Sequence, residues 1–225
     1  SHNATYGTGP GQQSEFDLGT LGYSQTTVNF DVTTQMDMEG FAGPVSLAMG
    51  AEMRMENYTI EAGEEAGYAD GGFDVLDGPN AGASAAVGCQ CLPGLAPNNE
   101  QDRDRDAFSV YVDAEADVLD NLLVNVALRT ENYSDFGQTT NGKVAMRYEL
   151  QDGVAARGSF STGFRAPALQ EAYFSSIATN FIDGIPYEVG TFPVDTEPAR
   201  ALGAQDLEPE TSTNLSAGMT YKDDT

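Results

Sequence analysis

Apolar and polar residues alternate one by one over long stretches of the chain. From Phe108 to Val118, every even-numbered residue is apolar, and the odd-numbered residues are Ser, Tyr, Asp, Glu and Asp. A period of two residues is typical of a β-strand with one apolar and one polar face. The same alternation predicts seven strands, near residues 28–38, 45–56, 108–118, 122–131, 143–150, 154–164 and 213–221.

The predicted strands are long and their connections alternate in length. Most strands span ~9–13 residues, whereas strands of globular proteins usually have ~5–6. The short connections are Phe41–Pro44, Leu119–Asn121 and Gln151–Gly153, the very long ones are Ile60–Asp106 and Arg165–Thr211, and Ser134–Asn141 is intermediate. Strands of ~9–11 residues cross a bilayer when tilted. Short turns at one end and long loops at the other are typical of an outer-membrane β-barrel.

The pattern therefore predicts an all-β, antiparallel, transmembrane sheet that is closed in the parent protein, because lipid offers no hydrogen bonds to an open sheet edge. A soluble β-sandwich shows the same alternation and stays open as an alternative. Very long loops at one end only are unusual for a compact soluble domain. We expect one face to carry the apolar residues Val28, Phe30, Val110, Val112, Val124, Val126, Val144 and Met146, and the other to carry Arg129, Arg147 and Arg157.

Composition excludes several classes of function. The 225 residues include 35 acidic and 10 basic ones, giving a net charge of −25. Nucleic acid is excluded as a partner, because binding of phosphates requires clustered Lys and Arg. The hydrophobic content of 40% argues against a disordered chain. No apolar stretch is long enough for a transmembrane helix.

The sequence offers no catalytic or metal centre. His2 is the only histidine, so histidine catalysis and multi-histidine metal sites are excluded. We find no Ser–His–Asp set, nucleophile elbow or phosphate-binding loop, and we expect neither an enzyme nor a bound cofactor.

Two motifs carry a resemblance to a known family. The strand "RGSFSTGFRAP" (Arg157–Pro167) leads into a long loop, and "LEPETS" (Leu207–Ser212) opens the next strand. These segments resemble the R-x-S-x-S-x-G-F-R-A-P and L-x-P-E-x-S motifs of TonB-dependent outer-membrane receptors. The resemblance covers nearly the whole chain.

The resemblance implies a 22-stranded barrel with an N-terminal plug domain. Seven strands supply only part of it, so residues 1–225 are interpreted as one partial barrel domain, without the plug and without either terminus of the parent. The implied location is the outer membrane of a Gram-negative bacterium. The implied partners are outer-membrane lipid, the plug of the same parent chain, the TonB energy complex, and a small-molecule or oligosaccharide substrate.

The implied function is energy-dependent import of a scarce nutrient, such as a siderophore, a corrinoid or an oligosaccharide. A passive porin or adhesin barrel is the main alternative. A soluble, acidic, extracellular binding sandwich is a further one.

Candidate site residues fall into two groups. Gly163, Phe164, Arg165, Ala166 and Pro167 are expected to shape the strand–loop junction, because proline cannot donate to a β-ladder. "PALQEAYF" is predicted to form a short helix with Pro167 near its first position. The candidates for contact with ligand or lumen are the inward polar residues Glu52, Arg54, Tyr111, Arg129, Arg147, Arg157 and Arg165. Opposite charges are expected to pair across neighbouring strands.

Two features of the first long loop have alternative interpretations. Cys89 and Cys91 could form a local disulfide, which an extracellular loop permits but which would close a small, strained ring. They could also pair with cysteines elsewhere in the parent. The net charge of −8 between Glu61 and Asp106 is interpreted as solvated charge, because "DRDRD" lacks the glycine and the terminal Glu of an EF-hand Ca²⁺ loop.

The isolated fragment is expected to have unpaired edges and an exposed apolar face. The edges are predicted near Val28 and Leu215, and the even-numbered residues from Phe108 to Val118 are expected to be exposed. Such a fragment would aggregate in water.

Overall fold

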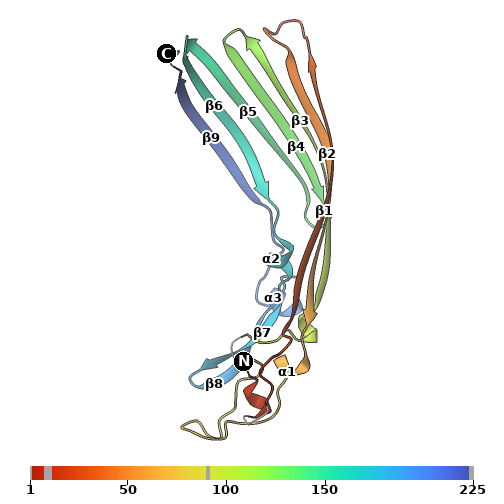
Figure 1. The fold of residues 1–225 in the computed structure, drawn as a ribbon, viewed down its shortest axis with the longest axis vertical. Coiled ribbons are helices and arrows are strands. Elements are labelled where there is room, and N and C mark those ends of the chain that lie inside the picture. Colours follow the sequence, from red (N-terminus) through yellow and green to blue (C-terminus); the bar gives the residue numbers. More distant parts are fainter. Residues whose placement is uncertain (1, 8–11, 90–91, 223–225) are drawn as a thin grey trace. The chain divides into compact units, whose positions relative to one another are not determined.

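The computed structural model describes residues 2–7, 12–89 and 92–222. Within them, the strands are β1 (Gly19–Met36), β2 (Val45–Ala62), β3 (Gln101–Leu119), β4 (Leu122–Tyr133), β5 (Gly137–Gln151), β6 (Val154–Arg165), β7 (Ser176–Ile182), β8 (Ile185–Thr191) and β9 (Glu210–Tyr221) (Figure 1). The helical turns are η1 (Ala4–Tyr6), α1 (Glu65–Tyr68), η2 (Pro97–Asn99), α2 (Leu169–Tyr173) and α3 (Glu197–Ala201). The predicted all-β, antiparallel fold class is confirmed.

The seven predicted strands form one sheet in the order β1-β2-β3-β4-β5-β6-β9. β9 pairs with β6 because β7 and β8 form a separate two-stranded hairpin between them in sequence. Neighbouring strands of an antiparallel sheet run in opposite directions. The short turns that follow β1, β3 and β5 therefore share one end of the sheet, as predicted, and the two long connections leave strands at the opposite end.

Several strands extend well beyond their predicted bounds; β1 begins at Gly19 and β2 ends at Ala62. β3 begins at Gln101, so "DRDRD" belongs to a strand and not to the preceding loop. β5 begins at Gly137, which leaves only residues 134–136 as the connection from β4. The run "GQTTNG" has no apolar alternation of its own, but it pairs residue by residue with the last part of β4. Pairing with a neighbouring strand thus determines the secondary structure of a segment whose own sequence pattern does not predict it.

The β7–β8 hairpin was not predicted. Its tip is Asp183–Gly184, and both residues have positive φ, 52° and 79°. Asp-Gly between two apolar runs is a strong signal for a two-residue hairpin turn. The signal was present in "FIDGIPY" inside the segment interpreted as a loop.

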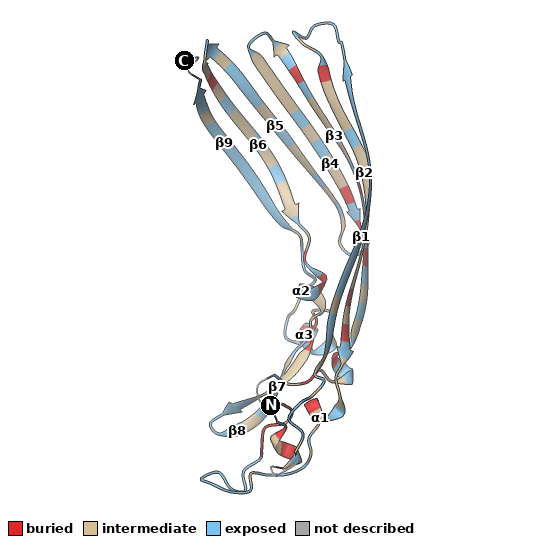
Figure 2. Ribbon diagram, viewed as in Figure 1, coloured by how far each residue is buried: buried red, intermediate tan, exposed pale blue. Residues whose placement is uncertain are grey.

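The chain divides into two compact units. The first, here called the loop unit, contains residues 1–24, 57–104 and 168–207. Its core consists of buried Tyr58, Ile60 and Leu169, against which Leu95, Tyr173 and Phe174 pack. The second, here called the sheet unit, contains residues 25–56, 105–167 and 208–225. Buried residues are only scattered along its strands (Figure 2).

Strand register confirms the predicted division of the sheet unit into two faces. Val112 is opposite Leu128, and Val126 is opposite Val144, so these apolar side chains share a face. Arg129 is opposite Tyr111 on the other face, where Arg147 is opposite Arg157. The tyrosine hydroxyl of β3 also donates to Asp31 of β1, which places neighbouring Phe30 on the apolar face.

The apolar face is largely open to its surroundings. Of the even-numbered residues in β3, Phe108, Val110 and Val112 are exposed. Ala114 and Val118 are half-buried and Ala116 is buried, so the prediction of exposure was wrong for these three. The methyl group of an alanine projects little above the sheet, and at position 116 it lies opposite the larger Val124.

We predict that Val126→Arg in the full-length parent protein destabilises it in a bilayer by about 2–4 kcal/mol, because the apolar face is the one expected to meet lipid and an arginine near the midplane there costs that much. Unfolding by denaturant in lipid vesicles measures the change. The matched control is Ala127→Arg, one residue along the same strand on the polar face. Equal losses from both variants would contradict the assignment of faces.

Candidate functional site

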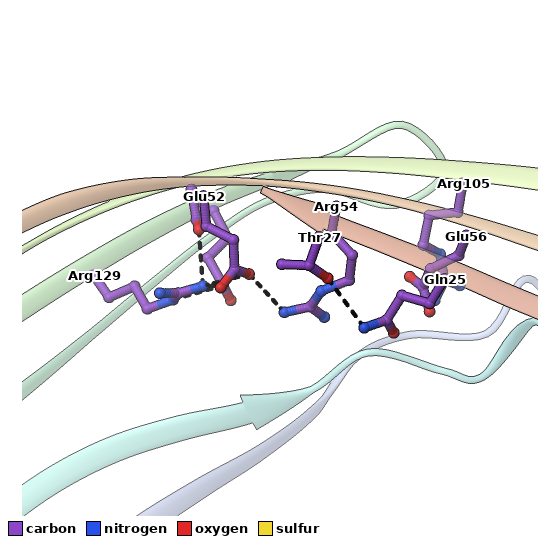
Figure 3. Close-up of polar contacts among 9 residues, drawn as sticks. Gln25, Thr27, Glu52, Arg54, Glu56, Arg105 and Arg129 are labelled. Carbon is purple, nitrogen blue, oxygen red and sulfur yellow. Dashed lines mark hydrogen bonds and ion pairs between the residues drawn. The ribbon is translucent and has the colours of Figure 1, made fainter. Parts of the chain in front are cut away.

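A network of charged side chains joins β2, β3 and β4 on the polar face of the sheet. Arg129 Nη2 lies 3.1 Å from Glu52 Oε1 and 2.6 Å from Glu131 Oε1, and it donates to Ser109 Oγ at 2.8 Å. Arg54 Nη2 lies 2.7 Å from the same Glu52 oxygen. Figure 3 shows Glu52 between the two guanidinium groups. The Glu52–Arg129 pair joins β2 to β4 across β3, so in this network the predicted pairing between neighbouring strands is not what the structure has. Glu52 is shared by two arginines.

Tyr111 is held by a second lateral contact. Its hydroxyl donates to Asp31 at 2.7 Å, which links β3 to β1 across β2. Gly50 of β2 makes this contact possible, because a Cβ atom there would lie 2.5 Å from Cε1 of the tyrosine ring. On the same face, Asn125 Nδ2 donates to Asp113 at 2.8 Å.

A buried arginine organises the turn between β4 and β5. Arg105 is 3% exposed, and its Nη2 lies 2.6 Å from Asp135 Oδ2. Glu56 lies 3.9 Å from Nη1 of the same guanidinium. The rings of Tyr133 and Phe136 stack with centroids 4.4 Å apart, and the guanidinium lies 6.0 and 5.7 Å from their respective centroids. These contacts fix the three-residue turn together with the hydrogen bonds that Ser134 exchanges with the backbone of Asp106.

Phe164 of the "GFRAP" segment contacts this cluster. Its ring meets Tyr133 edge to face, with centroids 5.8 Å apart. Aromatic pairs in this geometry contribute about 0.5–1.5 kcal/mol beyond their buried area. Phe164 therefore ties the end of β6 to the end of β4.

Arg165 joins the two sequence motifs directly. It is paired in register with Glu210, 45 positions later in the chain. Its Nε donates to Oε2 at 3.1 Å and its Nη2 to Oε1 at 2.9 Å, which is a bidentate arginine–carboxylate contact. We call this contact the β6–β9 clamp. It closes the long segment between β6 and β9 at its base.

The other residues of the motif shape the same junction. Gly163 lies close to β9, since a Cβ atom there would be 2.9 Å from Ser212 Oγ. Pro167 is buried, and the predicted short helix follows it. Helix α2 begins at Leu169 with Ala168 as its N-cap, so Pro167 precedes the cap and the prediction that it stands near the first helical position was wrong by two residues. The Ala168 N–H donates to Glu171 at 2.9 Å.

Several shallow hollows lie on the polar face of the sheet unit, among them one of about 510 Å³ lined by Thr33, Ser46, Asp113 and Glu115, among others, and the two described next. One, of about 470 Å³, is lined by Tyr111, Arg129 and Lys143, among others. The other, of about 230 Å³, is lined by Asp113, Glu115, Lys143 and Arg147, among others. The predicted site residues are therefore distributed along the wall and are not gathered in one pocket. Arg157 and Arg165 line neither of these two hollows.

In the loop unit, the two long segments contact each other. Asn99 Nδ2 donates to Ser175 Oγ at 2.9 Å, and Thr179 Oγ1 donates to the Val87 carbonyl at 3.1 Å. A hollow of about 170 Å³ between them is lined by Tyr68, Gly88, Pro93, Ile177 and Glu188, among others. Arg103 and Asp195 form a further ion pair at 3.1 Å.

The cysteine prediction reaches beyond the described residues. Cys89 is buried and forms an isolated antiparallel bridge with Asn3. Cys91 lies outside the described residues, and so does the proposed Cys89–Cys91 pairing. In residues 2–7, 12–89 and 92–222, no three His, Cys, Asp or Glu side chains are grouped so as to hold a metal ion. Among the helices of this part of the chain, none has the length and apolar character needed to cross a membrane.

Sequence reasoning missed the cluster around Arg105. The residue was assigned to the acidic loop, although its odd number continues the polar alternation of β3. Extending that alternation upstream from Phe108 would have placed Arg103 and Arg105 on the polar face. Glu210 was part of a motif, but its role as the partner of Arg165 required the register of β6 and β9.

Comparison with known proteins identifies the family. The profile described as "TonB dependent receptor-like, beta-barrel" matches residues 1–225. The chain belongs to this family. It is thus part of a receptor barrel and not of an enzyme, as the sequence predicts. No curated protein matches the chain significantly.

Solved structures of siderophore receptors share the fold. PirA from Acinetobacter baumannii is 16% identical with a TM-score of 0.57, over 91% of this chain and 25% of that one. PirA from Pseudomonas aeruginosa is 15% identical with a TM-score of 0.59, over 92% and 30%. A variant of PfeA, the ferric enterobactin receptor of P. aeruginosa, in complex with enterobactin, is 15% identical with a TM-score of 0.58, over 91% and 25%. The chain therefore spans about a quarter to a third of the length of these receptors.

We predict that Arg105→Ala destabilises the full-length receptor by about 3–5 kcal/mol, because it leaves Asp135 of the β4–β5 turn and Glu56 of β2 without their buried counter-charge. Equilibrium unfolding in detergent measures this loss. The control is Arg200→Ala, which removes an ion pair with Asp206 in which both side chains are exposed. That change should cost less than about 1 kcal/mol. Similar losses from the two variants would refute the structural role of Arg105.

We predict a small coupling energy for the β6–β9 clamp, about 0.2–1 kcal/mol, because both side chains are more than half exposed. A double-mutant cycle with Arg165→Ala and Glu210→Ala measures it. Limited proteolysis should nevertheless show faster cleavage between residues 166 and 209 in either variant, because the base of the segment is loosened. Unchanged cleavage in both would show that the clamp does not order the segment.

Proposed function

We propose that the protein is an outer-membrane transporter that imports a scarce nutrient with TonB-coupled energy, and that its substrate is a ferric siderophore. The observation that carries the proposal is the match of the receptor-barrel family to residues 1–225. The siderophore receptors among the structural neighbours favour an iron chelate over a corrinoid or an oligosaccharide. The seven strands would form part of the barrel wall in the outer membrane of a Gram-negative bacterium.

The open edges of the sheet support a larger barrel. β1 and β9 each have a neighbour on one side only within the described chain. In lipid, the free N–H and C=O groups of an edge strand must be paired. We infer that further strands of the parent pair with both edges and complete the 22-stranded barrel, which a plug domain of the same chain fills.

The polar face would line the lumen of this barrel. Glu52, Arg54, Tyr111 and Arg129 are engaged in contacts within the wall. We therefore assign these residues mainly to the rigidity of the wall, and Arg165 to the base of an outer loop. Substrate would meet the protein first at the two long segments, residues 63–100 and 166–209.

The charge of these segments restricts the substrate. Residues 63–100 contain six acidic residues and no basic one, and residues 166–209 contain seven acidic residues and one basic one. Each segment thus has a net charge of −6. A field of one sign repels ligands of that sign and accelerates the association of ligands of opposite sign. We therefore propose a neutral or cationic iron chelate, in contrast to a polyanionic one.

A passive porin or adhesin remains the second candidate. It would need neither an energy source nor a selective outer surface. Energy dependence of uptake separates it from the leading proposal.

We predict that the full-length receptor, produced in a Gram-negative strain without other siderophore receptors, imports radiolabelled iron bound to neutral or cationic chelators under iron limitation. Uptake should be lost on deletion of TonB or collapse of the proton gradient. Anionic chelates should be taken up more slowly. At low salt, the triple variant Asp74→Asn, Asp77→Asn, Glu188→Gln should reduce the difference in uptake rate between anionic and cationic chelates. Uptake that persists without TonB would instead establish a passive pore, and preference for a polyanionic chelate would contradict the charge argument.

A further inference from the structure

Two arginines face each other across neighbouring strands of the wall. Arg147 of β5 is paired in register with Arg157 of β6, on the polar face. Side chains at directly opposite positions have Cβ atoms about 4.5–5.5 Å apart, and like charges there destabilise a sheet. The chain has only ten basic residues, and two of them are directly opposite each other here.

The contacts within the chain do little to neutralise the pair. Arg147 Nη1 lies 3.7 Å from Glu149 Oε2, and these side chains are 49% and 38% exposed. Such an exposed contact contributes little. In the part of the chain that the structure describes, no ion pair involves Arg157. Its guanidinium lies beside Gly218 of β9, where a Cβ atom would be 3.1 Å from Nε.

The other arginines of the sheet unit have close acidic partners. Arg54, Arg105, Arg129 and Arg165 each have a carboxylate oxygen within 3.1 Å. The residues next to the arginine pair in the same row are Leu123 on β4 and Gly218 on β9, and neither can supply a carboxylate. Four arginines of the sheet unit thus have close acids within the chain, whereas Arg147 has only the longer contact with Glu149.

We propose that Arg147 and Arg157 form an anion site that binds a carboxylate of the polypeptide segment filling the barrel. One carboxylate can accept hydrogen bonds from two guanidinium groups at once, and such charge-assisted contacts are strong. The inference rests on the proposed function, because it requires a filled barrel. It adds the chemical contact by which this part of the sheet would bind the segment inside the barrel.

The position of the pair favours a resident group over a captured substrate. Arg157 is the fourth residue of β6, close to the turn Gln151–Gly153. The long segments leave the sheet at the opposite end. The pair is therefore near the other end of the strands, where a segment inside the barrel could remain in contact with it.

The test uses Arg157→Lys in the full-length receptor, treated with a carbodiimide that joins an amine to a carboxylate in direct contact. Peptide mass spectrometry then locates the carboxylate joined to position 157. We expect a cross-link to an Asp or Glu outside residues 1–225, and we expect the additional change Arg147→Gln to lower its yield severalfold because one side of the site is lost. The control is Arg200→Lys, whose introduced amine should couple to Asp206.

Three outcomes would overturn the inference. One is a link from position 157 only to acids of this chain, such as Glu115 or Glu149. Another is no link at position 157 while the control reaction succeeds. The third is a link that forms only with an added carboxylate-bearing chelate, which would make the pair a substrate site. Energy-dependent iron uptake is measured on the same Arg157→Lys receptor. Uptake without the expected cross-link would overturn this inference alone, whereas absence of uptake in the unsubstituted receptor would overturn the proposed function.

Discussion

The pairing of every backbone N–H and C=O group in a nonpolar environment constrains the rest of this structure. A strand that faces lipid cannot hydrogen-bond to water, so it must pair on both sides. That requirement imposes long strands, a fixed register and a strict division of side chains between two faces. The polar face can then carry charge at mid-strand positions, because only the other face meets lipid.

The charged face is organised by lateral contacts. Glu52 links Arg54 and Arg129, and the Tyr111–Asp31 hydrogen bond reaches across an intervening strand at Gly50. The Glu52–Arg129 and Tyr111–Asp31 contacts join strands that are separated by one strand in the sheet and so are not paired through their backbones. They fix side chains in place, so that the polar face of the sheet has a defined pattern of charge.

Sequence reasoning predicted the sheet correctly because the alternation of apolar and polar residues in β3, β4 and β6 indicates both that the segment is a strand and which side chains share a face. It failed where local pattern and pairing diverge. "GQTTNG" is a strand only because β4 lies beside it. "DRDRD" resembles a solvated loop until its place in β3 and the contact of Arg105 with Asp135 are known. The candidate residues were assigned to the correct face, but their partners depend on which strands are adjacent. Arg165 and Glu210 illustrate this, since neither sequence motif by itself indicates that these two residues form an ion pair.

The β6–β9 clamp has a consequence for how such a receptor can change over generations. The two ends of the intervening segment lie side by side at Arg165 and Glu210, and the segment contains its own hairpin, β7–β8. The entropy of closing a loop rises only slowly with its length. A lineage can therefore lengthen, shorten or replace this segment while the strands beneath keep their register. The clamp thus separates a scaffold whose register is fixed from a segment whose length and sequence can change without disturbing it.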